Sequence, residues 1–187
     1  MPRTGRPQDR ELLSALEALG TEPFDGIVWR TGWATRMPTV GSATAGRWHP
    51  EGAFEALYTS LTEDGALAEV YYHLSRAPIF SSRPMRLHRF AVKTRRTLRL
   101  PGMEALARLG IEEAKFRSME FTRSQEIGAA AYLLDCDAML VPSARWPCLN
   151  LVLFLDRLDG GAAIDVLDST EVNWPAWREQ RASSVEF

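Results

Sequence analysis

The 187-residue sequence contains few of the residues that build disulfide-bonded or metal-dependent folds. Only two cysteines occur, Cys136 and Cys148, and neither belongs to a C-x-x-C pair or to a mixed cysteine and histidine spacing. We therefore expect neither a disulfide framework nor a zinc site, and we expect a reducing cytoplasm as the setting. The histidines, His49, His73 and His88, show no paired metal-binding spacing either, so no metal is expected.

The sequence also lacks long apolar runs, an excess of charge of one sign and the common nucleotide motifs. No window approaches the ~20 apolar residues of a membrane span, and the N-terminus has no signal-like apolar run. With 22 basic and 24 acidic residues, the formal net charge of −2 disfavours direct binding of nucleic acid. Neither a Walker loop nor a Rossmann glycine fingerprint occurs. These absences predict a soluble protein without membrane or nucleic-acid partners, and they argue against Walker-type NTPases and Rossmann folds.

Apolar residues, by contrast, are plentiful. They make up 45% of the chain, which is enough for one sizeable core and indicates a single domain with short appendages. We predict an N-terminal helical appendage over residues 1–26, the main domain over residues 27–167 and a C-terminal segment over residues 168–187.

Hydrophobic periodicity predicts strands and helices mixed without a regular βαβ repeat, which favours the α+β class. Helices are predicted over residues 10–19, 103–109, 112–118 and 123–134, and another is predicted to start at a capping box formed by Ser60 and Glu63. Strands are predicted over residues 27–30, 56–59, 87–93, 97–100, 138–141, 149–155 and 163–167. A long loop rich in Gly, Thr and Ala, residues 31–46, follows the first strand, and loops of that length are often functional.

Glu69 is the first candidate for chemistry. Leu67, Val70, Tyr71 and Leu74 recur at helical spacing, and at ~100° per residue Glu69 points away from the centre of that apolar stripe. One turn earlier the same face carries only small residues, so a ligand could approach the helix beside the carboxylate. The alternative is an ordinary glutamate on a solvated helix face.

Two further candidates precede this helix. Arg47 follows Gly46, so its guanidinium could make bidentate contacts with phosphate oxygens while the backbone comes close. A simple surface charge is the alternative. Tyr58 lies in a predicted strand, where its ring could stack on a flat base with the hydroxyl left free, or could pack in the core.

The segment VPSARWPCLNLVLF, residues 141–154, ends one strand at Pro142 and begins another after a turn. Ser143 at this turn could donate its hydroxyl and backbone N–H to an anion. An ordinary hairpin turn is the alternative. No G-x-S-x-G elbow surrounds the serine, so nucleophilic catalysis of the hydrolase type has little support.

In their order and context these pieces resemble the RES domain, a bacterial toxin family named for its Arg, Glu and Ser residues. The resemblance covers roughly residues 27 to 155. It rests on VWR at 28–30, GRW at 46–48, LYT at 57–59, ALAEV at 66–70 and VPSAR at 141–145, which leads to NLV at 150–152. The resemblance implies a fold similar to ADP-ribosyltransferases of the diphtheria-toxin type, with two small sheets, flanking helices and an NAD+ cleft. NAD+ is then expected as substrate rather than cofactor, with inorganic phosphate as a co-substrate.

The same resemblance implies a toxin that cleaves the nicotinamide–ribose bond of NAD+, with phosphorolysis or hydrolysis ahead of transfer to protein. Breaking that bond develops oxocarbenium character on the ribose, which Glu69 is expected to stabilise. Arg47, with Arg30, is expected to neutralise the pyrophosphate, and Tyr58 to orient the nicotinamide. Ser143 is expected to bind a phosphate or to position the nucleophile. Glu69, Arg47 and Tyr58 form the predicted catalytic set.

The family is typically encoded beside an antitoxin that carries a helix-turn-helix domain and blocks the cleft with another segment, so the resemblance implies such a partner. The sequence is also compatible with a homodimer. Transfer of ADP-ribose to a protein target is one alternative, and a catalytically inactive module that binds a partner is another. RNA-directed activity is disfavoured by the net charge. The resemblance assigns no role to the Trp-rich segment NWPAW, residues 173–177.

Overall fold

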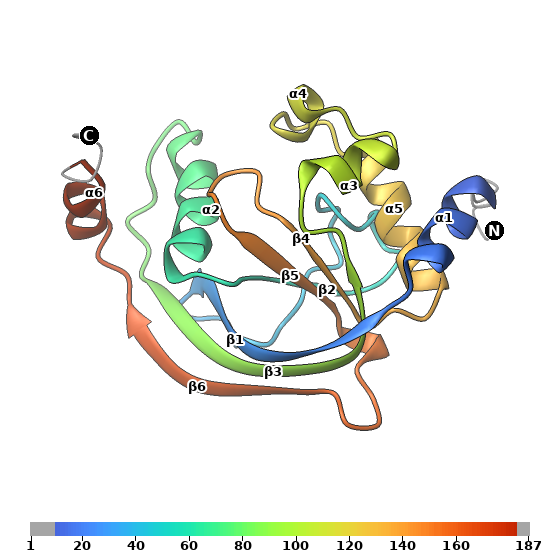
Figure 1. The fold of residues 1–187 in the computed structure, drawn as a ribbon. Coiled ribbons are helices and arrows are strands. Elements are labelled where there is room, and N and C mark those ends of the chain that lie inside the picture. Colours follow the sequence, from blue (N-terminus) through green and yellow to red (C-terminus); the bar gives the residue numbers. More distant parts are fainter. Residues whose placement is uncertain (1–9, 183–187) are drawn as a thin grey trace.

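The computed structural model describes residues 10–182, which form a mixed α and β fold (Figure 1). This arrangement confirms the coarse expectation of strands and helices in one mixed fold. The elements, in chain order, are α1 (Arg10–Leu19), β1 (Glu22–Trp33), β2 (Ala56–Ser60), α2 (Glu63–Ser75), β3 (Met85–Arg99), α3 (Met103–Arg108), α4 (Glu113–Phe116), α5 (Thr122–Leu133), β4 (Ala138–Pro142), β5 (Leu149–Phe154), the short 3-10 helix η1 (Leu155–Arg157), β6 (Ala163–Glu171) and α6 (Trp174–Ala182).

The strands form one sheet in the order β1–β2–β5–β4–β3–β6, and β1 also pairs with β3. The first five strands in that order therefore pair in a closed ring, and β6 pairs with β3 outside this ring. β3 pairs antiparallel with β1 and β6 and, near its end, parallel with β4. Two separate small sheets were expected. The described strands instead form one hydrogen-bonded sheet, because β3, with 15 residues, is long enough to pair with β1 and β6 and also with β4.

β3 replaces two predicted strands, residues 87–93 and 97–100, because the polar residues between them stay extended. Asp137, just before β4, accepts hydrogen bonds from the backbone N–H groups of Arg95 at 2.6 Å and Arg96 at 3.0 Å. These contacts satisfy the backbone where the hydrophobic alternation is interrupted. The other strands and most helices lie within a few residues of their predicted positions. The predicted domain boundaries after residues 26 and 167 both fall inside strands, β1 and β6.

The helix α1 has the predicted bounds, and its apolar face is part of the core. Leu12 and Leu16 are only 3% and 2% exposed and belong to the largest apolar cluster, together with Ile127 of α5. Burying two leucines in this way removes enough apolar surface to hold the helix against the domain. No helix among residues 10–182 is both long and apolar enough to cross a bilayer.

The helix α2 packs on β3 through Ala66 and Leu67, which contact a cluster that includes Met85 and Leu87. The helix begins after Thr62, whose Oγ1 accepts a hydrogen bond from the Gly65 N–H at 3.1 Å. The predicted capping box of Ser60 and Glu63 is therefore wrong, because β2 continues through Ser60 and the cap falls two residues later.

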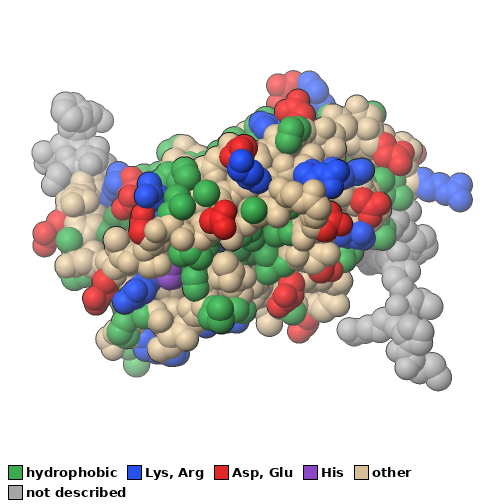
Figure 2. Space-filling view, turned by 90° about the horizontal axis from the view of Figure 1, so that it is seen from below, with side chains coloured by type: hydrophobic (Ala, Val, Ile, Leu, Met, Phe, Trp, Pro, Cys, Tyr) green, Lys and Arg blue, Asp and Glu red, His purple; other side chains and the backbone are tan. Residues whose placement is uncertain are grey.

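The outer side of β3 and β6 carries ion pairs such as Arg89 with Asp168 at 2.7 Å and Lys93 with Asp25 at 3.1 Å. Seen from this side, basic and acidic side chains are interspersed (Figure 2). The charges on this face therefore offset one another locally, as the near-neutral composition suggests.

Gly128 lets α5 contact the backbone of the loop that carries Arg47. A methyl group at Gly128 would lie 1.7 Å from the carbonyl oxygen of Trp48, a separation that no real contact allows. Alanine is favoured over glycine within a helix by ~1 kcal/mol, but here overpacking against backbone outweighs that gain.

We predict that Gly128→Ala lowers the free energy of unfolding by at least ~2 kcal/mol, measured by urea denaturation. Gly102→Ala is the control, because nothing lies within 4 Å of the added methyl, and it should change stability by less than ~1 kcal/mol. Equal stability of the two variants would contradict the close approach of α5 to the loop.

Candidate active site

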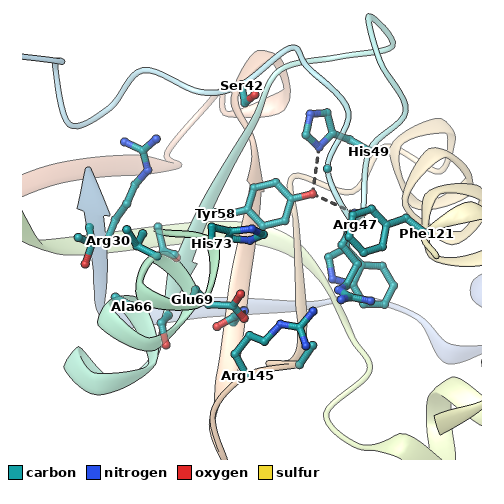
Figure 3. A pocket seen from close by; sticks show the side chains of 18 of the residues that line it. Arg30, Ser42, Arg47, His49, Tyr58, Ala66, Glu69, His73, Phe121 and Arg145 are labelled. Carbon is teal, nitrogen blue, oxygen red and sulfur yellow. Dashed lines mark hydrogen bonds between the residues drawn. The ribbon is translucent and has the colours of Figure 1, made fainter. Parts of the chain in front are cut away.

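A cavity of about 430 Å³, the main cavity, brings together most of the predicted site residues (Figure 3). Arg30 of β1, Arg47 of the long loop, Tyr58 of β2 and Glu69 of α2 line it. Ser143 is not among the lining residues but contacts Glu69 from the turn between β4 and β5, residues 143–148, the Ser143 turn. Five chain segments, four of them from the first half of the sequence, therefore converge on one space.

Glu69 is fixed by two hydrogen-bond donors. The Ser143 hydroxyl donates to Glu69 Oε1 at 2.7 Å, and Asn150 Nδ2 of β5 donates to the same oxygen at 3.2 Å. The predicted orientation of Glu69, away from the apolar stripe of α2, therefore turns it into the cavity rather than into bulk water. Two donors on one oxygen hold the carboxylate in a single orientation.

The Ser143 hydroxyl makes all its hydrogen bonds inside the protein. Its Oγ donates to Glu69 and accepts from the backbone N–H groups of Arg145 at 3.1 Å and Trp146 at 3.2 Å. A hydroxyl has one proton and two lone pairs, so these contacts use its full capacity. In this structure Ser143 orients Glu69, and a direct contact of its hydroxyl with phosphate stays a prediction.

The hydroxyl of Tyr58 is held rather than free, which differs from the expectation. It accepts a hydrogen bond from the Trp48 N–H at 2.9 Å and lies 3.0 Å from His49 Nδ1. Gly46 makes room for it, because a Cβ there would lie 2.5 Å from the hydroxyl oxygen. Burial raises the pKa of Tyr58, so the phenol stays neutral and its ring is anchored at the cavity wall.

His49 is a wall residue to which the sequence assigned no role. Its ring is fully buried at 0% exposure, and burial lowers its pKa, so the imidazole is neutral. Because a lone histidine after an Arg-Trp pair has no diagnostic spacing, only its contact with Tyr58 reveals it.

Arg47 is positioned by aromatic rings and a backbone carbonyl. Its guanidinium lies 4.8 Å from the ring centre of Phe116 and 4.5 Å from that of Phe121, and Nη2 donates to the Ser118 carbonyl at 3.2 Å. Burial, followed by repulsion from Arg145, lowers the pKa of Arg47 to about 10, which leaves it charged at neutral pH. Its Nη1 has no hydrogen-bond partner within residues 10–182. An unpaired cationic donor at a cavity wall suits an anionic ligand.

Two more arginines line the cavity from different sides. Arg30 donates from Nη1 to the Pro38 carbonyl at 2.8 Å and lies across Glu69 and Tyr58 from Arg47 (Figure 3). Arg145, which was not in the predicted set, stacks 3.6 Å from the ring centre of Tyr72. Its place in the VPSAR segment was the only sequence signal for it. The carboxylate of Glu69 thus lies among three cations.

Within the described residues, no three His, Cys, Asp or Glu side chains gather in a way that could hold a metal ion. The main cavity presents one oriented carboxylate, a neutral phenol and several guanidinium groups, and His49 and His73 are also in its lining.

Comparisons with known proteins identify the family of this chain. A family model described as the RES domain matches residues 27–176. The chain belongs to the RES domain family. The match includes every predicted site residue.

Among curated proteins, the chain is similar to the "Probable NAD(+) phosphorylase Rv3189" of Mycobacterium tuberculosis, with 34% identity over 152 residues, 76% of this chain and 72% of that protein. It is also similar to the NAD(+) phosphorylase MbcT of Mycobacterium bovis, with 24% identity over 182 residues, 94% of this chain and 97% of that protein.

Among solved structures, the fold matches a chain of the crystal structure of the M. tuberculosis MbcT–MbcA toxin-antitoxin complex. The TM-score is 0.82 at 22% sequence identity, and the match covers 94% of this chain and 100% of that chain. This likeness establishes the fold of this RES domain.

The anchored hydroxyl of Tyr58 gives a stability prediction. Tyr58→Phe should lower the free energy of unfolding by ~1–3 kcal/mol, because the buried Trp48 N–H loses its acceptor. Chemical denaturation measures the change. Tyr72→Phe, whose hydroxyl only accepts an exposed contact from Arg76, is the control and should cost under ~0.5 kcal/mol. If Tyr58→Phe costs no more than this control, the hydroxyl does not anchor the ring.

Proposed function

We propose that this protein is the toxin of a toxin-antitoxin pair and cleaves the nicotinamide–ribose bond of NAD+ with inorganic phosphate as acceptor. The observation that carries the proposal is a single carboxylate, Glu69, fixed by Ser143 and Asn150 in a cavity with Arg30, Arg47 and Arg145. Membership of the RES domain family and the names of two relatives, both NAD(+) phosphorylases, support it.

The residues of the cavity have separate tasks in this reaction. Glu69 lies beside the ribose and stabilises the positive charge that develops at C1 as the bond to nicotinamide breaks. Ser143 and Asn150 keep that carboxylate in place, so no reorganisation is needed when the charge appears. Tyr58, with its hydroxyl anchored away from the ligand, offers its ring to the nicotinamide.

The bond changes balance without any further reactant. The electron pair of the broken bond goes to the nicotinamide ring nitrogen, and nicotinamide leaves as a neutral molecule. An oxygen of inorganic phosphate forms the new bond to ribose C1, which gives ADP-ribose 1-phosphate. Arg47 and Arg145 supply the positive charge that binding of the phosphate groups requires.

A partner is part of the proposal. The solved structure that the fold matches is a toxin-antitoxin complex, so we infer that an antitoxin covers the cavity of this chain as well. That the antitoxin carries a helix-turn-helix domain is inferred from the family resemblance alone. Transfer of ADP-ribose to a protein is the competing activity, and it would need a surface that docks the target beside the cavity.

The deciding experiment incubates purified protein with NAD+ in the presence and absence of inorganic phosphate and identifies the products by mass spectrometry. Phosphate-dependent release of nicotinamide and ADP-ribose 1-phosphate is the expected result. Free ADP-ribose at the same rate in both samples would identify hydrolysis instead. ADP-ribose attached to an added protein extract, with nicotinamide as the small product and neither ADP-ribose nor ADP-ribose 1-phosphate released, would identify a transferase.

Glu69→Gln tests the carboxylate. The amide oxygen can still accept from Ser143 and Asn150, so the fold should persist, while the negative charge is lost. We predict that kcat falls at least ~100-fold, as expected for loss of a charge that stabilises a transition state. Steady-state NAD+ consumption measures the rate and thermal melting is the control for folding. A variant that turns over NAD+ at nearly the rate of the parent would remove Glu69 from catalysis.

A further inference from the structure

A second cavity of about 240 Å³, the side pocket, opens beside the main cavity. Arg30, Thr31, Val70 and His73 line both, so the two spaces share a wall. His73 lies one helical turn after Glu69 on α2, which places the shared wall next to the catalytic carboxylate. The proposed reaction uses the main cavity and leaves the side pocket unassigned.

Besides apolar side chains, the side pocket is lined by hydrogen-bond donors of positive or neutral charge. Its lining includes Arg30, Arg36 and His88, and none of its lining residues is acidic. Thr31 and His88 are only 7% and 3% exposed, yet Thr31 Oγ1 and His88 Nε2 have no hydrogen-bond partner in the described part of the chain. His88 Nδ1 is already bonded to Ser169 Oγ at 2.6 Å, which leaves Nε2 for a ligand.

We propose that the side pocket is an anion subsite that binds a phosphate group. Buried polar groups without partners are rare in proteins. Thr31 Oγ1 and His88 Nε2 have almost no exposed surface but belong to residues of the pocket wall, beside the space where a ligand could complete their hydrogen bonds. A phosphate oxygen accepts from a hydroxyl, an imidazole N–H and a guanidinium alike. The phosphate group is either inorganic phosphate or part of the pyrophosphate of NAD+. These two candidates rest on the proposed function, whereas the subsite itself does not.

The test compares Thr31→Val, which removes the hydroxyl at constant shape, and Arg36→Ala with the parent protein. Arg10→Ala, an exposed residue of α1, is the control for the loss of one positive charge, and Thr31→Ser should restore the hydroxyl. Calorimetric titrations with inorganic phosphate and with ADP measure binding without catalysis. Steady-state assays vary phosphate at saturating NAD+ and NAD+ at saturating phosphate.

We expect Thr31→Val and Arg36→Ala to raise the dissociation constant of one of the two anions, phosphate or ADP, about 10-fold. The control Arg10→Ala should change neither constant appreciably. A rise for phosphate, with a matching rise in its KM, assigns the pocket to the co-substrate. A rise for ADP and in the KM for NAD+ assigns it to the pyrophosphate. Unchanged binding of both anions overturns the subsite, even if the parent protein consumes NAD+. Loss of anion binding in a protein without NAD+ turnover keeps the subsite and rejects the proposed function.

An independent set of contacts concerns the Trp-rich segment, which forms α6. Trp177 Nε1 donates to Asp64 Oδ1 of α2 at 3.0 Å, and Arg181 pairs with the same carboxylate. On its other side, α6 reaches the Ser143 turn. The ring centres of Trp177 and Trp146 are 6.4 Å apart, and the Arg181 guanidinium lies 5.2 Å from the Trp146 ring centre.

These contacts connect α6, the Ser143 turn and α2 to one another beside the catalytic carboxylate. Trp146 donates its N–H to the Ser143 hydroxyl, which donates to Glu69 on α2. The helix α6 therefore links the two elements whose relative position sets the Ser143–Glu69 hydrogen bond. Its own anchor is Trp174, 8% exposed, which packs against Tyr71 of α2 with ring centres 5.8 Å apart.

We infer that Trp177 and Arg181 are positioning residues, which hold the Ser143 turn against α2 and act on catalysis through Ser143. This second inference also rests on the proposed function for its catalytic part. A displacement of about 1 Å at a reacting group can cost 10- to 100-fold in rate, so a helix far from the substrate can matter.

Trp177→Ala should lower kcat ~10-fold or more while the KM for NAD+ stays within about threefold. Trp177→Phe, which keeps the ring, should recover most of the rate, and Arg178→Ala on the same helix is the control. In a Ser143→Ala background the effect of Trp177→Ala on kcat should largely vanish, because both act on one contact. Additive effects would make α6 merely structural.

A second readout needs no activity. Hydrogen exchange of the Arg145 and Trp146 amides, which donate to Ser143, should accelerate in Trp177→Ala. If that variant does not fold, Arg181→Ala removes the contact with Trp146 and leaves the buried Trp174 in place. Unchanged exchange at both amides in a folded variant overturns the positioning role, whether or not the protein consumes NAD+.

Discussion

The hydrogen bond from Ser143 to Glu69 is the contact on which the site depends, because it joins two parts of the chain that are 74 residues apart. A glutamate on an isolated helix would sample many rotamers in water. Here the turn between β4 and β5 brings a hydroxyl to one carboxylate oxygen, and Asn150 of β5 brings an amide to the same oxygen. The sheet order places β5 next to β2 and close to α2, so the topology itself supplies these donors.

The guanidinium groups around this carboxylate are held in place by uncharged groups. Arg30 is held by the carbonyl of Pro38, Arg47 by the rings of Phe116 and Phe121, and Arg145 by the ring of Tyr72. A carbonyl or a ring face orients a guanidinium without cancelling its charge, so the field remains directed at the cavity. This arrangement suits a dinucleotide whose reactive bond must lie beside a carboxylate while its phosphates meet cations.

Small residues decide how closely the walls approach. Gly46 admits the Tyr58 hydroxyl, and Gly128 admits the carbonyl of Trp48, so the loop that carries Arg47 is held between β2 and α5. The Trp-rich helix α6 acts at the opposite wall, where it connects α2 with the Ser143 turn. Part of the packing that holds the site, at Gly128 and α6, thus lies outside the main cavity.

The sequence by itself determined the family, the mixed α and β class, nearly all element positions and four of the cavity-lining residues. Periodicity and short motifs involve residues that are close together in the sequence, so they can be recognised without a structure. Only the tertiary structure decided that the strands form one sheet, that Thr62 caps α2, that Ser143 touches Glu69, that His49 and Arg145 line the main cavity, and that α6 contacts α2 and the Ser143 turn. Each of these depends on pairing between distant segments or on the direction of one side chain. For these residues, unlike Glu69 on its helix, the local sequence does not specify the partner, because backbone groups and side chains find such partners only after the chain has folded.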